Sequence, residues 1–201
     1  MIKAVIFDLG GVLVDNPAPG MFSHYAKTLN VTVKQLEKVY PKYEVDWQKG
    51  ALTEEEFWKK VTTDLHVPQP NVTSLWLDGF LSSYHEKGEM FSLIKKLKSD
   101  GYTIALLSNT EVPIMNYIKE KSWSDFDLFI YSCEVGMRKP DLEIYETTLS
   151  NLNINPEEAV FIDDKAENIN AAKSIGMHAI LFANPQQVIS ELHNVGLSSL
   201  L

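Results

Sequence analysis

Five short apolar runs, each rich in branched residues, constrain the fold of this chain more than any other feature. Such runs are typical of β-strands that are buried on both faces of a parallel sheet. They lie at residues 3–8, 103–109, 127–132, 159–164 and 178–183. The pattern therefore predicts a central sheet whose strands are spread along the whole chain.

Stretches with helical periodicity separate these runs. Residues 89–98 place four apolar side chains on one stripe, and Gly101 follows as a stop signal. Pro140 can open a second helix, and Asp164 with Glu167 has the spacing of a capping box before a third. Strands that alternate with helices predict an α/β fold, a Rossmann-like doubly wound parallel sheet with right-handed crossovers.

The interval between the first two predicted strands is far longer than an ordinary crossover. Residues 16–85 hold several amphipathic segments rich in aromatic residues and no convincing strand. Thr53 and Glu56 form a capping-box pattern before one helix, and Asn71 is predicted to open another. The predicted boundaries are 1–15 and 86–201 for the sheet domain and 16–85 for a small helical domain.

Charge and composition limit the partners of the chain. The net charge is −9, with lysines spread along the sequence, so a polyanion such as nucleic acid would be repelled. Cys133 is the single cysteine, which excludes an intramolecular disulfide and favours a reducing compartment. The apolar run near residue 1 is too short for a signal peptide or a membrane span. We expect a cytoplasmic protein without a membrane partner, a monomer or weak homodimer.

Polar residues stand at the ends of four predicted strands. In chain order they are Asp8; Ser108 with Asn109; Lys139, after a short loop; and Asp163 with Asp164. Because the carboxyl ends of parallel strands meet at one edge of the sheet, these side chains are expected to share a crevice. Three carboxylates there need a cation, and an all-oxygen set favours Mg²⁺. Serine, asparagine and lysine suit an anion such as phosphate.

Taken singly, each of these residues has a simpler interpretation. Asp or Ser at the end of a strand is commonly a helix N-cap, and lysine before proline is commonly an exposed helix start. Four such events at four successive strand ends are much harder to explain by chance. Together they indicate phosphoryl transfer through an aspartyl-phosphate.

The same residues resemble the haloacid dehalogenase superfamily, whose members are mostly Mg²⁺-dependent phosphatases. Four segments resemble its four motifs in order: IFDLGGVLVD (6–15), LLSNT (106–110), GMRKPDLEIYE (136–146) and FIDDKAENI (161–169). The helical insert after the first strand is similar to the alpha-helical cap of that family. The resemblance spans the chain and implies a hydrolase that acts on a small phosphorylated metabolite.

The resemblance also implies roles for individual residues. Asp8 would be the nucleophile and a magnesium ligand, and Asp164 would ligate the metal with Asp163 beside it. Ser108 and Lys139 would bind the phosphoryl group, with Lys139 also assisting catalysis. Asn109 would also bind the substrate, as a supporting polar group, and Asn168 would be a second supporting polar group.

Gly10 departs from the family pattern, which has a second aspartate two residues after the nucleophile as general acid and base. Glycine keeps the backbone carbonyl that this position lends to the metal, so the magnesium site is expected to survive. A general acid is worth about 10²- to 10⁴-fold in rate, a small part of the acceleration of phosphate ester hydrolysis. We expect a preference for leaving groups that depart easily, such as those of sugar 1-phosphates or acyl phosphates. Asp15 is a candidate replacement acid.

Similar FDLG sequences occur among bacterial members regarded as sugar-phosphate phosphatases, which supports the same expectation by analogy. The cap would close over the crevice and contact the organic part of the substrate. His24, Tyr43, Trp47 and Trp58 are candidates for these contacts, although aromatic residues on amphipathic helices more often belong to a core.

Two other functions stay open. A catalytically impaired member of the fold could act as a binding or interaction protein, with Gly10 as a sign of decay. A 2-haloacid dehalogenase would use Asp8 to attack carbon and would need no metal. A phosphomutase would also require an acid–base group at residue 10, and a receiver domain would be shorter, with its acidic pair after the first strand.

Overall fold

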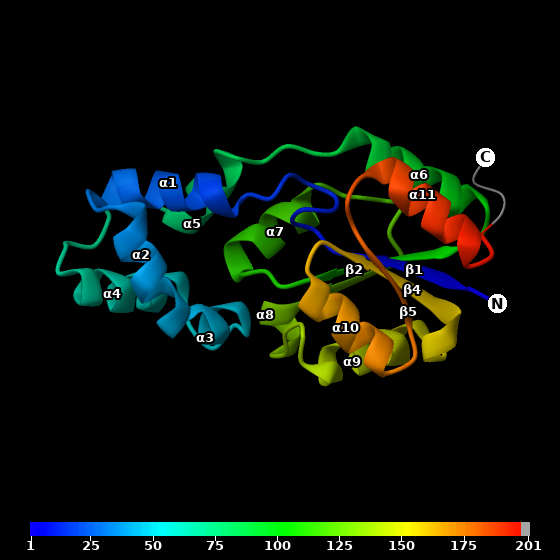
Figure 1. The fold of residues 1–201 in the computed structure, drawn as a ribbon. Coiled ribbons are helices and arrows are strands. Elements are labelled where there is room, and N and C mark those ends of the chain that lie inside the picture. Colours follow the sequence, from blue (N-terminus) through cyan, green and yellow to red (C-terminus); the bar gives the residue numbers. More distant parts are fainter. Residues whose placement is uncertain (198–201) are drawn as a thin grey trace.

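A parallel five-stranded sheet lies at the centre of the computed structural model, which describes residues 1–197 (Figure 1). The strand order is β3-β2-β1-β4-β5. The strands are β1 (Ala4–Phe7), β2 (Thr103–Ser108), β3 (Leu128–Tyr131), β4 (Ala159–Asp163) and β5 (His178–Leu181). The five apolar runs therefore form the five strands, and the predicted α/β fold is confirmed.

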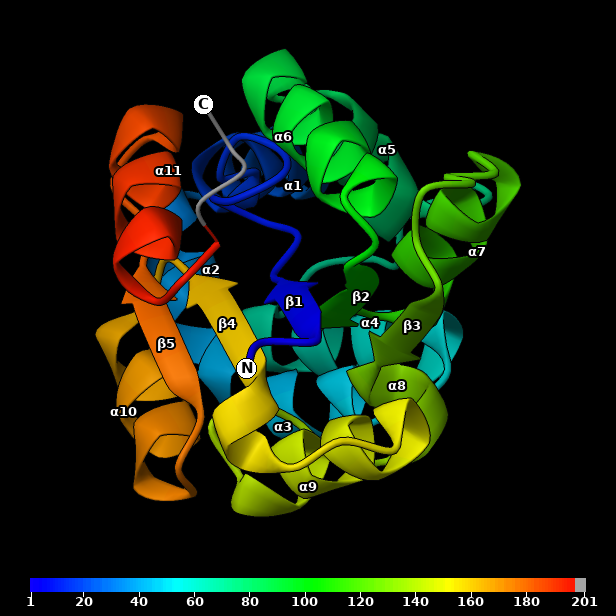
Figure 2. The ribbon, with the colours of Figure 1, turned by 90° about the vertical axis from the view of Figure 1, so that its right-hand side faces the viewer.

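Helices cover both faces of the sheet (Figure 2), and the side chains of the central strands alternate between the two apolar layers beneath these helices. Val5 and Phe7 of β1 belong to the layer under α6 (Gly88–Ser99) and α11 (Pro185–Asn194). Ile6 belongs to the opposite layer, under α9 (Leu142–Leu152) and α10 (Ala166–Ser174). Two further helices of this part of the chain are α7 (Val112–Glu120) and α8 (Ser132–Val135), and η2 (Pro156–Glu158) is a 3₁₀ turn. We call this part the sheet lobe.

The expectation that all five runs are buried on both faces is wrong for β5. His178 and Leu181 are exposed, and Leu181 keeps 46% of its surface accessible. The physical reason is the position of β5 at the edge of the sheet, where it pairs with β4 alone.

Residues between β1 and α6 form a helical lobe at the left of Figure 1. Its helices are α1 (Ala18–Leu29), α2 (Val33–Val39), α3 (Glu44–Gln48), α4 (Glu54–Leu65) and α5 (Leu75–Leu81), with the 3₁₀ turn η1 (Tyr40–Lys42). Aromatic rings hold it together: Trp76 lies against Tyr25, Trp47 and Phe57, with ring centroids 5.3 to 5.5 Å apart. Such pairs stabilise beyond the area that they bury.

Two crossing segments join the lobes. The N–H of Asp15 donates to the carbonyl of His85 at 2.9 Å, and the N–H of Lys87 donates to the carbonyl of Leu13 at 2.8 Å. Val14 and Glu86 form an antiparallel bridge between the same segments. Among residues 1–197, no helix combines the length and the apolar character that crossing a bilayer requires.

Helix starts show where local sequence signals succeed and fail. The capping box of Thr53 and Glu56 is confirmed at the start of α4. The helix predicted to open at Asn71 begins instead at Leu75, capped by Ser74. The capping box predicted at Asp164 is also wrong, because α10 begins at Ala166 and no side chain caps it. The Asp164 carboxylate is therefore not used by the helix.

Two helical glycines, one in each lobe, give a matched test of helix packing. A Cβ at Gly79 of α5 would lie 2.2 Å from Cε1 of the buried Tyr25 ring, whereas a Cβ at Gly88 of α6 would meet nothing within 4 Å. We expect Gly79→Ala to lower the free energy of unfolding by about 1–3 kcal/mol, as overpacking does. Gly88→Ala should change it by less than about 0.5 kcal/mol or stabilise slightly. Urea denaturation measures both, and equal effects would contradict this packing.

Candidate active site

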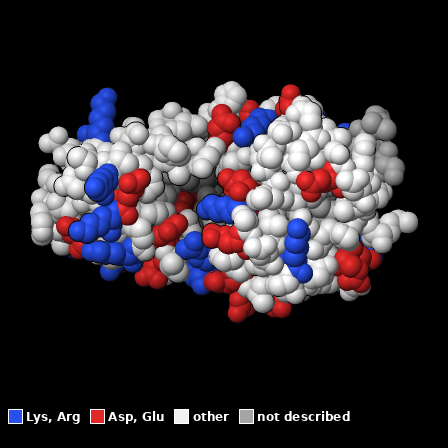
Figure 3. Space-filling model, viewed as in Figure 1, with Lys and Arg blue, Asp and Glu red and all other residues white. Residues whose placement is uncertain are grey.

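A cavity of about 280 Å³ lies between the two lobes, where the molecular surface is hollowed and bordered by charged side chains (Figure 3). The carboxyl ends of β1, β2 and β4 form its floor on the sheet side, and helices of the other lobe form its roof. Most residues predicted for the site line this cavity: Asp8, Gly10, Ser108, Asn109, Lys139, Asp164 and Asn168. The strand ends thus bring together side chains that are up to 160 positions apart.

Lys139 is at the centre of the group. Its Nζ contacts Asp8 Oδ1 at 2.6 Å, Asp163 Oδ2 at 2.7 Å and the carbonyl of Leu107 at 2.9 Å. Burial alone would lower the pKa of Lys139, but the charges of Asp8 and Asp163 outweigh it and hold that pKa above its ordinary value. The buried ammonium therefore stays charged.

The register of the sheet explains these three contacts. Phe7 is paired with Leu106 on one side and with Ile162 on the other. The next residue on each of the three strands is therefore Asp8, Leu107 or Asp163, at one common level. Only a long cation that approaches from outside the strand ends can contact all three, and Lys139 is such a cation.

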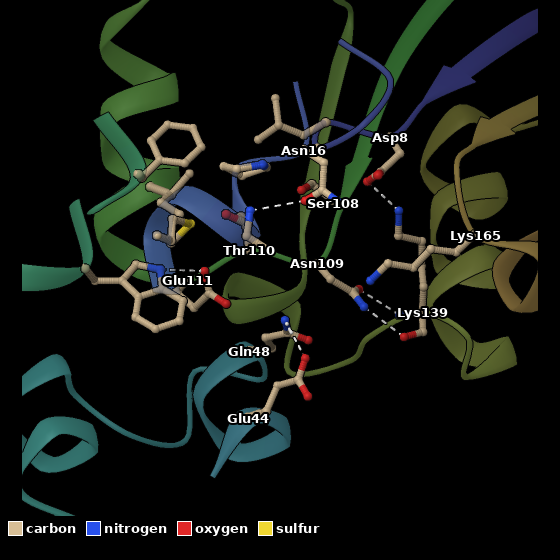
Figure 4. Close-up of a pocket in the computed structure, with 18 of the residues that line it drawn as sticks. Asp8, Asn16, Glu44, Gln48, Ser108, Asn109, Thr110, Glu111, Lys139 and Lys165 are labelled. Carbon is tan, nitrogen blue, oxygen red and sulfur yellow. Dashed lines mark hydrogen bonds and ion pairs between the residues drawn. The ribbon is translucent and has the colours of Figure 1, made fainter. Parts of the chain in front are cut away.

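Asn109 holds the segment that carries Lys139. Its Nδ2 donates to the carbonyl of Lys139 at 2.8 Å, and its Oδ1 accepts the N–H of Lys139 at 2.8 Å. Both polar atoms of the amide are thus bonded to the backbone (Figure 4). Asn109, which the sequence predicts as a substrate-binding residue, therefore positions Lys139 in this structure.

Asp163 is fully buried and surrounded by donors. Besides Lys139, it accepts the N–H of Lys165 at 2.8 Å and the Nδ2 of Asn168 at 3.0 Å on each oxygen. It does not line the cavity. These bonds make Asp163 an anchor for Lys139 and Asn168.

Asp164 has different surroundings. Its Oδ1 is buried and has no hydrogen-bond partner among residues 1–197. Burial and the neighbouring charge of Asp163 raise the pKa of Asp164 above its ordinary value. Burial likewise raises the pKa of Asp8 to about 6, although Lys139 acts against it. Both shifts arise mainly from burial, and the charge of Asp163 adds to each of them.

The carboxylates of Asp8, Asp163 and Asp164 fit a divalent cation. One oxygen of each lies within 4.8 Å of the others. Hard cations such as Mg²⁺ take oxygen ligands of this kind. A divalent cation here would give the buried oxygen of Asp164 a partner and would offset the excess of three carboxylates over the one ammonium of Lys139.

Gly11 makes room for Asp164, and sequence reasoning missed it. A Cβ on Gly11 would lie 2.1 Å from Asp164 Oδ2, and its φ of +85° is in the left-handed region that favours glycine. Gly10 is less constrained, because a Cβ there would meet only Pro17 Cδ, at 3.5 Å. The pair of glycines after a buried strand was the available signal for a close backbone approach.

Asp15, the candidate replacement acid, does not line the cavity. It is largely exposed and pairs with Lys87 at 3.3 Å and with His85 at 3.4 Å in the crossing segments. Its location therefore does not favour a catalytic role.

The roof of the cavity is built from residues that the sequence did not single out. The four aromatic candidates of the insert, His24, Tyr43, Trp47 and Trp58, do not line it. Tyr25, Tyr40 and Trp76 do, together with Glu44 and Gln48.

Glu111 is the other missed residue, at the start of α7. It is 4% exposed, lines the cavity and accepts a hydrogen bond from Trp76 Nε1 at 2.9 Å (Figure 4). Burial raises the pKa of Glu111 to about 7, although the bond from Trp76 acts to lower it. This contact joins the two lobes across the cavity.

The chain is similar to known proteins in both sequence and fold. A family model described as haloacid dehalogenase-like hydrolase matches residues 2–176. The chain is 27% identical over 197 residues to the sesquiterpene phosphatase astK of Aspergillus oryzae, covering 96% of each protein. It is 27% identical over 189 residues to the D-ribitol-5-phosphate phosphatase of Bacteroides thetaiotaomicron, covering 88% of this chain and 89% of that protein.

Some relatives are longer. The chain is 28% identical over 205 residues to the drimenol cyclase drtB of Aspergillus calidoustus and spans 37% of its length. Among solved structures, a HAD family enzyme of Bacteroides thetaiotaomicron, in complex with magnesium and inorganic phosphate, superposes with a TM-score of 0.71. It is 23% identical, covering 90% of this chain and 93% of that one, and it supports the fold.

The raised pKa of Glu111 predicts a pH-dependent stability. Between pH 4.5 and pH 7 the folded protein keeps a proton on Glu111 that the unfolded chain releases, so this group lowers the free energy of unfolding as pH rises through that range. Glu111→Gln does not titrate and can still accept from Trp76. From pH 5 to pH 8, the stability of the wild type relative to this variant should fall by roughly 2–3 kcal/mol.

Urea denaturation at both pH values measures this difference. Glu120→Gln removes a carboxylate from the exposed end of the same helix and serves as control, because its difference from the wild type should stay nearly constant. A pH-independent difference for Glu111→Gln would show that Glu111 is ionised in the folded protein at pH 5.

Proposed function

Because this chain belongs to the haloacid dehalogenase-like hydrolases, we propose that it hydrolyses small phosphate monoesters with Asp8 as the nucleophile. The observation that carries this proposal is the position of the Asp8 carboxylate. It lies directly after the carboxyl end of β1, pairs with Lys139 and lines a cavity that Ser108 also lines. A buried lysine beside a carboxylate on the floor of a small cavity suits a phosphoryl group, because it supplies fixed positive charge there.

In the proposed reaction, an oxygen of Asp8 attacks phosphorus, the ester P–O bond breaks, and the leaving oxygen takes up a proton. Water then attacks the aspartyl-phosphate, which releases inorganic phosphate and restores the Asp8 carboxylate. Lys139 offsets the negative charge that gathers on the phosphoryl oxygens, and Ser108 would donate a hydrogen bond to them. Lys165, which lines the same end of the cavity, would add positive charge.

The residues that would hold Mg²⁺ are Asp8, Asp164 and the backbone carbonyl of Gly10. The unpartnered Oδ1 of Asp164 supports this assignment. Asp163 would lie beside these ligands and hold the residues around them, because its oxygens already accept from Lys139, Lys165 and Asn168. When bound, the ion would offset the charge of the carboxylates and of the phosphate ester.

The helical lobe, residues 16–85, would act as a cap that excludes water and contacts the organic part of the substrate. Its side chains already cover the cavity, which supports this role. The relatives include phosphatases named for a sugar alcohol phosphate and for a sesquiterpene, so similarity alone does not choose the organic group.

The alternatives fit the site less well. A 2-haloacid dehalogenase needs no metal, and it would leave the buried oxygen of Asp164 without a partner. A purely binding protein would have no need of the buried Lys139–Asp8 pair, which is costly to desolvate. Hydrolysis of a phosphate ester uses both features.

A panel of phosphorylated metabolites, assayed for phosphate release with Mg²⁺, tests the proposal. We expect turnover that chelation with EDTA abolishes and added Mg²⁺ restores. Asp8→Asn should lower kcat by at least about 10³-fold, because the nucleophile is lost. Asp46→Asn, the same change at an exposed position of α3, should retain wild-type rates. Full activity of Asp8→Asn would rule out the assigned nucleophile.

Gly10 predicts the dependence on the leaving group. Without a general acid, the wild type should hydrolyse p-nitrophenyl phosphate or a sugar 1-phosphate much faster than an alkyl phosphate. Since the Cβ position at residue 10 is open, Gly10→Asp can place a carboxyl there. This variant should raise kcat for the alkyl phosphate about 10- to 100-fold and change kcat for p-nitrophenyl phosphate little.

Gly10→Asn is the matched control, since it has the same shape and cannot transfer the proton in the same way. A similar gain with Asn, or equal gains on both esters, would show that residue 10 does not limit protonation of the leaving group.

A further inference from the structure

The end of the cavity away from Asp8 presents hydrogen-bond acceptors. Gln48 and Glu44 come from α3, and Glu111 comes from the start of α7. Figure 4 shows these three around the space opposite Asp8 and Lys139. None of the residues that the helical lobe contributes to the lining of this cavity is a lysine, an arginine or a histidine.

Gln48 has an acceptor that the described part of the protein leaves unsatisfied. The residue is 9% exposed, and its Oε1 is buried without a hydrogen-bond partner. Its Nε2 is turned toward Glu44 Oε1, at 3.4 Å. A buried amide oxygen without a donor costs free energy, so a ligand that brings a donor would bind favourably there.

Glu111 adds carboxyl oxygens as further acceptors beside Gln48. Only Oε2 of its carboxyl group receives the Trp76 N–H, and the group lines the cavity. The rings of Tyr25, Tyr40 and Trp76 also line the cavity and give it an apolar wall. Tyr25 and Tyr40 each stack on Trp76, with interplanar angles of 25° and 14°.

We propose that Gln48 and Glu111 bind hydroxyl groups on the organic part of the substrate, which makes the substrate a phosphate ester of a small polyhydroxylated compound. The inference rests on the proposed function, because it assigns the two ends of the ligand from the phosphate end at Asp8. The C–H faces of the ligand lie against the aromatic wall while its hydroxyls donate to the two acceptors. A cavity of about 280 Å³ is at the lower end of the range for small-molecule sites, in keeping with a short carbon chain.

Three esters of one carbon length test this assignment: a pentitol 5-phosphate, pentyl phosphate and 5-aminopentyl phosphate. All three are esters of primary alcohols, so the chemical step is similar. For the wild type with Mg²⁺, we expect kcat/KM for the pentitol ester to exceed that for pentyl phosphate at least tenfold, mainly through KM. Gln48→Met should reduce this ratio at least tenfold. Glu111→Gln should also reduce it, because it keeps one oxygen for Trp76 and replaces the other acceptor by an NH2 donor.

Glu120→Gln, on the same helix as Glu111 and outside the cavity, should keep the wild-type ratio. Thermal melting of each variant checks folding, and Glu111→Gln carries the test if Gln48→Met does not fold. An unchanged ratio in both variants, or no discrimination by the wild type, would overturn the proposal. Preference for the aminopentyl ester would replace hydroxyl recognition by recognition of a cation.

Binding to Asp8→Asn, measured by calorimetry with the pentitol and pentyl esters, separates recognition from turnover. Tighter binding of the pentitol ester that Gln48→Met removes would support the assignment even if hydrolysis is absent. Absence of hydrolysis of every ester, p-nitrophenyl phosphate included, would count against the proposed function. Equal binding of the two esters would count against the role of Gln48 and Glu111.

Discussion

The buried ammonium of Lys139 is the contact on which the arrangement of the site depends. It joins Asp8 of β1, Leu107 of β2 and Asp163 of β4 at one level of the three central strands. Taking three charged groups out of water is costly, and losing one partner of such a set costs about 3–5 kcal/mol. The set is therefore maintained by its own geometry: the two carboxylates repel each other unless the lysine is between them, and the lysine cannot stay charged without them.

Two asparagines keep Lys139 and Asp163 in the positions that this ion-paired set requires. Asn109 fixes the backbone of Lys139 through two hydrogen bonds, and Asn168 fixes Asp163. Asn109 is the residue after the last residue of β2, and Asn168 lies in the first turn of α10. The fold thus holds the charged atoms by main-chain and amide contacts, which leaves Asp8, Ser108 and Asp164 directed to the cavity.

Much of this arrangement could be predicted from the sequence, because it depends on two local patterns. Branched apolar runs mark buried strands, and a polar residue directly after such a run must lie at the carboxyl edge of the sheet. For that reason the residues from Asp8 to Asp164 could be grouped before any coordinates were known. The edge position of β5 could not be predicted, because composition does not reveal how many neighbours a strand has.

The roof of the cavity was less predictable, for a physical reason. A residue on an amphipathic helix packs inward or lines a cavity depending on how the helices cross, and that is decided by contacts distant in sequence. Trp47 and Trp76 look alike in the sequence, yet only Trp76 lines the cavity. Glu111 was overlooked because a carboxylate three residues after Ser108 resembles an ordinary first-turn residue of a helix. Asp164 had the spacing of a cap, and only the start of α10 at Ala166 showed that its carboxylate was free.

The two ends of the cavity differ in charge, and this difference constrains how any ligand can lie. Lys139 and Lys165 are at the strand ends, whereas Glu111, Glu44 and Gln48 are at the opposite end. Above pH 7 Glu111 is mostly ionised, so a phosphate placed beside it would meet a carboxylate, while a hydroxyl there would donate to an acceptor. Repulsion therefore disfavours the reversed orientation, and attraction favours the orientation with the phosphate beside Lys139. Because the acceptors come from both lobes, the ligand would add a contact between α3 and α7 to the hydrogen bond that Trp76 of α5 already makes with Glu111. Closure of the helical lobe and selection of the ligand would then depend on the same few atoms.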